Sequence, residues 1–179
     1  MTIKGIFCTI LAVCASQWAP SAMAPSAMAA SVTVDGRIAV STYGHGPDVL
    51  LIPGLASSEH VWDPTVTHLE GRYRVHVVQV FGFAGAPAQA NGKGAILVPV
   101  TDAIHDYIAA HHIAPVFLVG HSLGGLIGME LALHHPADIR KLMIVDALPF
   151  FGAIFGARDV PSILSQATSM RDGMSNESQ

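Results

Sequence analysis

Cysteine is scarce in this sequence of 179 residues, where only Cys8 and Cys14 occur, both near the amino end. A disulfide framework is therefore excluded for the remaining chain. Charged residues make up only 12%, and the net charge of −4 leaves no basic stripe for nucleic acid. No uninterrupted run of 18 apolar residues occurs, so no membrane span is predicted. The hydrophobic content of 51% excludes a disordered chain, and we expect one globular domain.

The first 29 residues have the pattern of a secretory signal peptide. Lys4 precedes an apolar stretch over residues 5–13, and two copies of Pro-Ser-Ala-Met-Ala follow. The second copy ends in Ala-Met-Ala at residues 27–29, which matches an A-x-A cleavage site. We therefore expect a secreted or periplasmic protein. Lipid attachment at Cys14 is the less favoured alternative, because a branched valine precedes that cysteine.

Short apolar runs alternate with helical patterns along the rest of the chain. The predicted strands cover residues 31–34, 38–42, 49–52, 74–81, 116–119 and 142–145. The first two flank a hairpin turn at Asp35-Gly36. Helices are predicted over residues 99–112 and 123–135, each with apolar residues on one face. Uninterrupted Val, Ile and Leu runs are typical of parallel strands, so the fold class is α/β, with a mostly parallel sheet and helices on both faces.

A nucleophile motif lies where one predicted strand meets a helix. The sequence Gly-His-Ser-Leu-Gly-Gly around Ser122 contains G-x-S-x-G in its strand–turn–helix context. The sharp turn strains the backbone of Ser122, and Gly120 and Gly124 avoid clashes two positions to either side. His121 and Gly125 complete this elbow. The serine hydroxyl would project at a helix N-terminus that favours developing negative charge. The alternative interpretation is a glycine-rich turn that only lets a helix pack closely.

From residue 48 to residue 151 the chain resembles an α/β-hydrolase of the esterase, lipase and haloperoxidase-like type. The matching pieces are Val-Leu-Leu-Ile-Pro-Gly at 49–54, Val-Phe-Gly-Phe-Ala-Gly at 80–85, the elbow at 120–125 and Ile-Val-Asp-Ala at 144–147. One departure is Pro53, where many members carry histidine. The resemblance implies a serine hydrolase that acts on a small ester-like or related acyl substrate and needs no cofactor.

The same resemblance implies an oxyanion hole made of backbone groups. In the family, one N–H comes from the loop after the third strand and the other from the residue after the nucleophile. Here those donors would be the amides of Leu55 and Leu123. Because only the backbone takes part, leucine is acceptable at both positions.

The acid and base of the family's triad are not found in this chain. The family order is Ser, then acid, then His, but histidine is absent after His135. We therefore expect the N-terminal portion of a hydrolase domain, with its core reaching about residue 148 and a lid region beginning over 149–179. Asp146, after the predicted sixth strand, is a candidate acid. A non-catalytic pseudoenzyme or binding fragment of the same fold is the alternative function.

Other motifs are expected to play lesser roles. His60 falls on the oxyanion loop or the helix that follows it, and we do not expect it to serve as the base, since a base needs direct hydrogen-bond reach. The pairs 111–112 and 134–135 fall at predicted helix ends, and no carboxylate accompanies them at metal-ligand spacing, so no metal site is predicted. The glycine-rich stretch 82–95 does not match a phosphate loop and is expected to line the pocket. The apolar strand 142–145 is expected to form an exposed sheet edge that favours self-association.

Overall fold

A computed structural model describes residues 31–176 of the chain. The predicted signal peptide and the alternative lipid site at Cys14 lie outside these residues. Within the described part, no helix has both the length and the apolar character needed to cross a bilayer.

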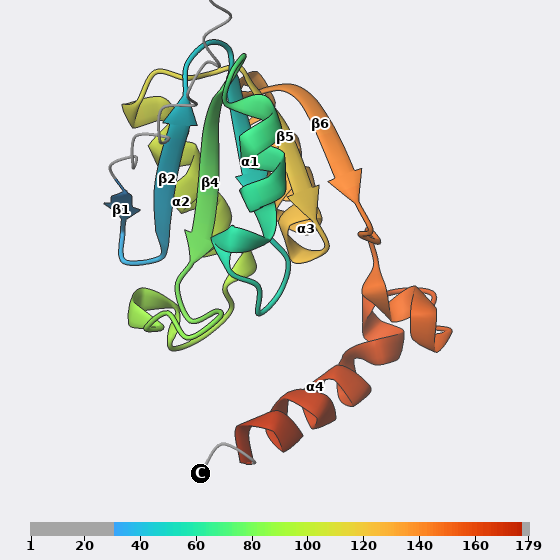
Figure 1. The fold of residues 1–179 in the computed structure, drawn as a ribbon. Coiled ribbons are helices and arrows are strands. Elements are labelled where there is room, and N and C mark those ends of the chain that lie inside the picture. The colour runs from blue at the N-terminus through green and yellow to red at the C-terminus, as the bar shows by residue number, and fades with distance from the viewer. Residues whose placement is uncertain (1–30, 177–179) are drawn as a thin grey trace, which may run out of the picture.

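The described residues contain a single sheet with the strand order β1-β2-β4-β3-β5-β6 (Figure 1). β2 pairs antiparallel with β1 and β4, whereas β3, β4, β5 and β6 pair in parallel. The strands are β1 (Val32–Val34), β2 (Ile38–Gly44), β3 (Asp48–Ile52), β4 (Arg74–Val80), β5 (Val116–His121) and β6 (Ile139–Val145). The predicted mostly parallel sheet is thereby confirmed.

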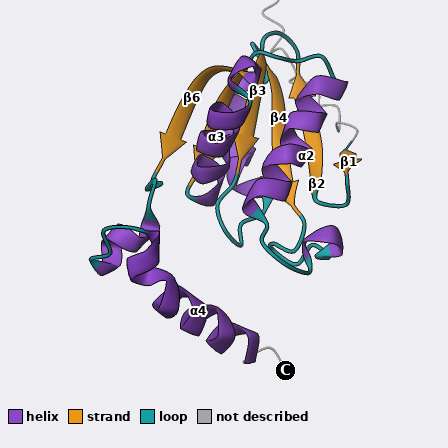
Figure 2. Cartoon of the chain, turned by 180° about the vertical axis from the view of Figure 1, so that it is seen from behind, coloured by secondary structure: helices purple, strands orange, loops and turns teal. Residues whose placement is uncertain are grey.

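Helices cover both faces of the sheet. Figures 1 and 2 show α1 on one face and α2 and α3 side by side on the other, while α4 lies beyond the end of β6. The α-helices are α1 (Asp63–Leu69), α2 (Leu97–Ala110), α3 (Leu123–His134) and α4 (Val160–Asn176). Short 3-10 helices lie at η1 (Glu59–Trp62), η2 (Gln89–Asn91), η3 (Pro136–Asp138) and η4 (Phe151–Phe155). The fold is therefore a three-layer α/β arrangement, as predicted.

The larger apolar core lies between the sheet and the pair α2 and α3. Helix α2 buries the face that its periodicity predicts, with Val100, Ile104, Tyr107 and Ile108 at most 2% exposed. Pro99 is the third residue of α2, where a missing N–H breaks no intrahelical bond. A smaller cluster around Val66 packs under α1 on the other face. Both faces of the central strands are thus buried.

Helix α3 packs unusually close to the sheet because of a glycine on its buried face. A Cβ on Gly128 would come within 2.8 Å of a methyl group of Leu142 and within 2.9 Å of one of Leu118. Those leucines belong to β6 and β5, the strands beneath the helix. This close contact holds the start of α3 at a fixed place over the end of β5, where the nucleophile motif lies.

Strand β6 forms one edge of the sheet. Met143 is 61% exposed and Ile144 is 40% exposed, so apolar side chains lie on the surface of a strand that, among the described residues, pairs on one side only, with β5. The predicted exposed edge is confirmed for the described residues. Self-association through this edge stays a prediction.

Candidate active site

Ser122 lies at the sharp turn between β5 and α3. Its φ of 50° and ψ of −116° place a non-glycine residue in a strained backbone region. Its N–H donates to the carbonyl of Val145 over 2.9 Å, and its own carbonyl accepts from the N–H groups of Gly125 and Leu126. The strained serine is therefore held from β6 on one side and from the first turn of α3 on the other.

The glycines of the elbow are required by close backbone contacts. A Cβ on Gly120 would overlap the carbonyl of Gly124, and a Cβ on Gly124 would overlap the carbonyl of Ile52. At Gly125 an added Cβ would lie 2.7 Å from the Cβ of Ala147. Each added carbon would force the turn apart, so the structural reason given for the G-x-S-x-G spacing is confirmed.

The loop after β3 lies directly against this elbow. A Cβ on Gly54 would come within 2.8 Å of Nδ1 of His121 and within 3.2 Å of the Cβ of Ser122. The loop is closed by a hydrogen bond from the N–H of Ser57 to the carbonyl of Gly54, 3.2 Å long. This arrangement places Leu55 in the lining of the same cavity as Ser122, where its amide was predicted to donate a hydrogen bond to the oxyanion.

Ser122 opens onto a cavity of about 370 Å³. Most of its lining is apolar, and Asp146 is the one charged side chain among the lining residues. Asp146 follows β6 directly and has a φ of 50°. The lining residues are Leu55, Ser122, Leu123, Leu126, Asp146, Ala147, Leu148 and Ile154. The structure therefore brings together the predicted nucleophile, both predicted oxyanion residues and the candidate acid.

Histidines do not line this cavity in the described part of the chain. His60 has a side chain 71% exposed and pairs with Asp63 over 3.3 Å, rather than facing Ser122. His121 is half-buried against the loop at Gly54. The pairs 111–112 and 134–135 lie at or just beyond the ends of α2 and α3, as predicted. No described histidine is thus placed to act on Ser122.

The glycine-rich stretch 82–95 does not line the cavity, so that prediction is wrong. Asn91 explains its placement, because its side-chain amide donates to the carbonyls of Arg37 and Phe81 over 2.8 and 3.0 Å. The Arg37 guanidinium donates a hydrogen bond to the side-chain oxygen Oδ1 of Asn91 over 3.0 Å. These bonds tie the stretch to the β1–β2 turn and away from Ser122.

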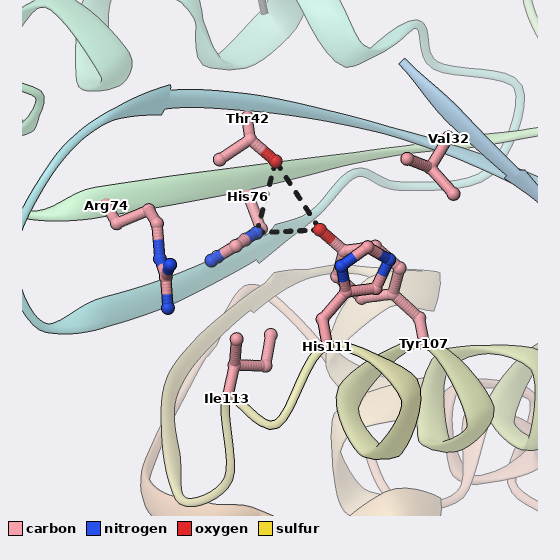
Figure 3. Close-up of a pocket in the computed structure, with 7 residues that line it drawn as sticks. All are labelled: Val32, Thr42, Arg74, His76, Tyr107, His111 and Ile113. Carbon is pink, nitrogen blue, oxygen red and sulfur yellow. Dashed lines mark hydrogen bonds between the residues drawn. The ribbon is translucent and has the colours of Figure 1, made fainter. Parts of the chain in front are cut away.

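A second polar cluster lies towards the amino ends of β3 and β4 (Figure 3). His76 on β4 is 3% exposed, and its ring joins Oδ1 of Asp48 and the hydroxyl of Tyr107, each over 2.8 Å. Arg74 also donates to Asp48. Burial lowers the pKa of His76 against the opposing effect of Asp48. Burial also opposes ionisation of Asp48, but hydrogen bonds from Arg74 and His76 outweigh it and lower the pKa of that carboxyl.

This second cluster borders a cavity of about 270 Å³. Its lining residues are Val32, Thr42, Arg74, His76, Tyr107, His111 and Ile113. The strands β3 and β4 are parallel, and both Asp48 and Arg74 are first residues of their strands. The cluster is therefore remote from Ser122, which follows the carboxyl end of a strand parallel to them.

The prediction that no carboxylate accompanies the paired histidines is wrong for the pair 134–135. Glu130 lies 3.2 Å from Nε2 of His134, one turn along α3. Asp138 lies 2.7 Å from Nδ1 of His105, and one ligand atom each of His105, His135 and Asp138 lies within 4.8 Å of the others. His105 and Asp138 are 33 residues apart, so no local spacing in the sequence could indicate this group.

Comparison with known proteins supports the resemblance drawn from the motifs. A family model described as the alpha/beta hydrolase fold matches residues 47–167. A pimeloyl-[acyl-carrier protein] methyl ester esterase of Aeromonas hydrophila is 35% identical over 116 residues, covering 65% of this chain and 44% of that protein.

Two solved structures share the fold. A hydrolase from Pseudomonas aeruginosa PA01 aligns with a TM-score of 0.60 at 22% identity, over 76% of this chain and 56% of that one, which shows the fold alone. The N-acyl homoserine lactonase AidH, solved with N-butanoyl homoserine, aligns with a TM-score of 0.59 at 28% identity, over 67% of this chain and 45% of that one.

The chain spans 36% to 48% of the length of the curated relatives that it matches. The family match nevertheless covers more than half of this chain and includes the strained serine, its glycines and the loop after β3. The chain belongs to the α/β hydrolase fold family.

Proposed function

We propose that this chain carries the nucleophile and the oxyanion hole of a serine hydrolase that cleaves small carboxylic esters or related acyl compounds. The observation that carries the proposal is the position of Ser122. It has a positive φ, lies at the start of α3 and opens onto a cavity also lined by Leu55 and Leu123. Family membership agrees with this chemistry.

The reaction would begin with attack of the Ser122 Oγ on the substrate carbonyl carbon, and the hydroxyl proton would pass to water, since no described histidine lines the cavity. The carbonyl oxygen then gains negative charge, which the backbone N–H groups of Leu55 and Leu123 would stabilise. The first N–H groups of a helix have no intrahelical acceptor. The amide of Leu123, the first residue of α3, is therefore not used by the helix and would be able to donate to the substrate oxygen. The helix dipole favours the same charge. The ester alcohol would then leave as the acyl bond to Ser122 is completed.

The lining of the cavity favours an acyl group that is small and apolar. Leu126, Leu148 and Ile154 provide the apolar surface, and a volume of about 370 Å³ is in the range of small-ligand sites. The relatives named above include a methyl ester esterase and a lactonase, both of which act on acyl–oxygen bonds by their names. We therefore favour esters and lactones over larger substrates.

We propose that residues 31–176 alone support only weak turnover. Asp146 is the candidate acid, but no described histidine lines the cavity to serve as the base. In triad hydrolases the loss of the base costs on the order of 10⁶ in turnover. The oxyanion hole and binding still leave roughly 10³–10⁴ over the reaction in water.

The absence of an imidazole among the described lining residues also favours a second candidate, a non-catalytic fragment that binds acyl compounds in the same cavity. The two candidates differ in one respect. The hydrolase forms an acyl bond to Ser122, whereas the binding fragment holds its ligand without bond formation.

The experiment that separates them is hydrolysis of p-nitrophenyl butyrate by the 179-residue chain. The hydrolase proposal predicts slow release of nitrophenol that Ser122→Ala reduces to the rate in buffer. Ser165→Ala is the matched control, because Ser165 is exposed on α4 and does not line the cavity. Saturable binding of p-nitrophenyl butyrate, with nitrophenol released no faster than in buffer, would instead support the binding fragment.

We also propose export of the protein through the predicted signal peptide. The supporting pattern is Lys4, the apolar stretch and the Ala-Met-Ala site at 27–29. Expression of the full sequence in a bacterial host should yield an exported form whose amino-terminal sequence begins at Ala30. An unprocessed cytoplasmic chain would contradict this proposal.

A further inference from the structure

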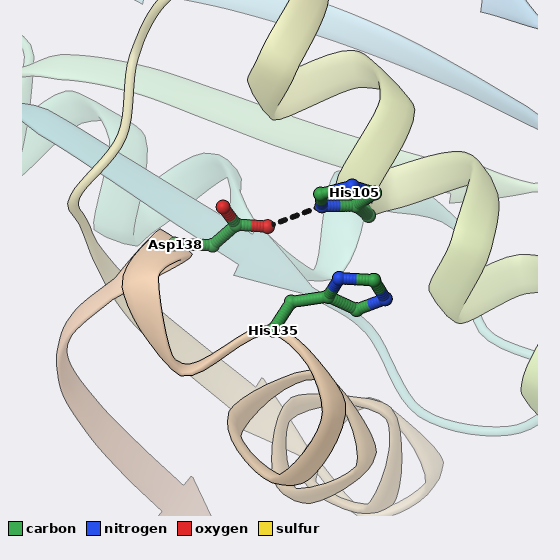
Figure 4. A group of neighbouring side chains, drawn as sticks. All are labelled: His105, His135 and Asp138. Atoms are coloured by element: carbon green, nitrogen blue, oxygen red, sulfur yellow. Dashed lines mark hydrogen bonds and ion pairs between the residues drawn. The ribbon is translucent and has the colours of Figure 1, made fainter.

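Three side chains with metal-binding atoms converge between α2 and the connection from α3 to β6 (Figure 4). His105 comes from α2, His135 caps the end of α3, and Asp138 ends η3 just before β6. One ligand atom of each lies within 4.8 Å of the others. Ser122 and His135 flank the 12 residues of α3 at opposite ends, about 20 Å apart by the helical rise.

We propose that His105, His135 and Asp138 bind a Zn²⁺ ion. Two imidazole nitrogens and one carboxylate oxygen are ligands that zinc takes in proteins. Magnesium and calcium prefer sets made of oxygen atoms, so this set disfavours them. The proposal replaces the sequence-based prediction that the chain has no metal site.

The local geometry needs only small adjustments to hold the ion. Nδ1 of His105 and Oδ2 of Asp138 are 2.7 Å apart, and tetrahedral zinc would separate them to roughly 3.3 Å. The rings of His105 and His135 are stacked, with centroids 3.8 Å apart and planes 17° apart. The His135 ring must therefore turn so that one nitrogen points at the ion, and its partial exposure leaves room for this turn.

Asp138 anchors the site because its carboxylate is buried. The residue is 7% exposed, and His105 supplies a hydrogen bond to it. A buried carboxylate gains most from a fixed positive charge nearby. His105 donates to Asp138 when the metal is absent and would ligate with the same Nδ1 atom when it is present, so zinc takes the place of that proton.

An adjoining cavity of about 540 Å³ gives the ion access from solvent. Its lining includes His135 and the acidic residues Asp102 and Glu130, whose charge attracts a cation. Glu130 is engaged with His134 over 3.2 Å. We therefore assign the fourth zinc position to water, which reaches the site through this cavity.

The ion would act as a clamp between elements. It would join α2 to the connection between α3 and β6, which otherwise meet here through one hydrogen bond and one ring stack. A ligand that binds only the folded chain stabilises it by mass action. The expected effect is therefore on thermal stability, with no direct part in chemistry at Ser122.

The test is zinc titration of the chelator-treated 179-residue chain, followed by calorimetry and thermal melting. We expect one zinc ion per chain and a rise in melting temperature on zinc addition. His105→Ala and His135→Ala should each weaken zinc binding by at least about tenfold and remove the rise in melting temperature. His68→Ala, at an exposed position on α1, is the matched control and should bind like the original chain.

If His105→Ala or His135→Ala folds poorly, His135→Gln and cobalt substitution provide a second test of the site. His135→Gln changes a partly exposed side chain, so the fold should persist by circular dichroism while zinc binding is lost. Cobalt substitution provides an independent reading, since a tetrahedral site gives strong visible absorption that His135→Gln should abolish. Absence of zinc binding by the original chain, or equal loss in His68→Ala, would overturn the proposal.

Discussion

Ser122 adopts a backbone conformation that costs roughly 1–3 kcal/mol for a residue with a side chain. Such strain persists only where the surroundings impose it. The surroundings here are the hydrogen bond from the Ser122 N–H to Val145 and the bonds that start α3 at its carbonyl. The glycines on either side then decide whether the turn can close at all.

We predict that Gly120→Ala destabilises the chain by about 1–3 kcal/mol, the usual cost of overpacking. The added methyl group would overlap the carbonyl of Gly124, which is backbone and has little room to move. Urea denaturation followed by circular dichroism measures the change. Gly71→Ala is the matched control, since a Cβ there meets nothing within 4 Å. Equal midpoints for the two variants would contradict the account of the elbow.

A separate prediction concerns His76 and the dependence of folding stability on pH. Its pKa is lowered below the ordinary value of 6.5, chiefly by burial. The charges of Arg74 and His111 act in the same direction, and Asp48 opposes them. The hydroxyl of Tyr107 faces the other ring nitrogen. The unfolded chain therefore binds a proton at His76 more readily than the folded chain does. The stability that depends on neutral His76 is full above pH 6.5 and declines as the pH falls below it.

The measurement is the urea midpoint at about pH 7.5 and about pH 5.5, the range in which an ordinary histidine titrates. We expect a lower midpoint at the acidic pH and a smaller difference in His76→Gln, which keeps hydrogen-bonding atoms in the site. His68→Gln should retain the full difference, because His68 is exposed. A pH difference unchanged in His76→Gln would show that other groups cause it.

At the scale of elements, β6 is the exposed apolar strand of the described sheet. Strands that leave N–H and C=O groups unpaired pair readily with other chains, and a lysine on the edge opposes this. We predict that the 179-residue chain self-associates and that Met143→Lys shifts it towards the monomer. Leu164→Lys, at a similarly exposed apolar position on α4, should have no such effect. Light scattering over a concentration series measures both variants, and a monomeric original chain would contradict the prediction.

Periodicity and turn residues were sufficient to predict the main elements. Strands β3 to β6, the hairpin at Asp35-Gly36 and helices α2 and α3 lie where the apolar patterns place them. The prediction that the stretch 82–95 lines the cavity was wrong because of the hydrogen bonds of Asn91. One partner, Arg37, is more than fifty residues away in the sequence, and the other, Phe81, follows the end of β4. Local patterns report which face is buried and do not report such bonds.

At the scale of the whole molecule, the described residues carry three groups of polar side chains. Ser122 and Asp146 lie at the carboxyl ends of β5 and β6, whereas Asp48 and His76 lie towards the amino ends of β3 and β4. The sequence predicted the first group because its motif is contiguous. The group of His105, His135 and Asp138 was missed because it forms only when α2 packs beside α3.

The assignment of Ser122 as the nucleophile is tested by covalent labelling with a fluorophosphonate, with the labelled residue located by peptide mass spectrometry. We predict one slow adduct, on Ser122, because the proposed oxyanion hole of Leu55 and Leu123 would assist attack by that serine. The adduct should disappear in Ser122→Ala and remain in Ser165→Ala. A folded chain that forms no adduct, or forms it on another serine, would contradict the assignment of Ser122 as the nucleophile.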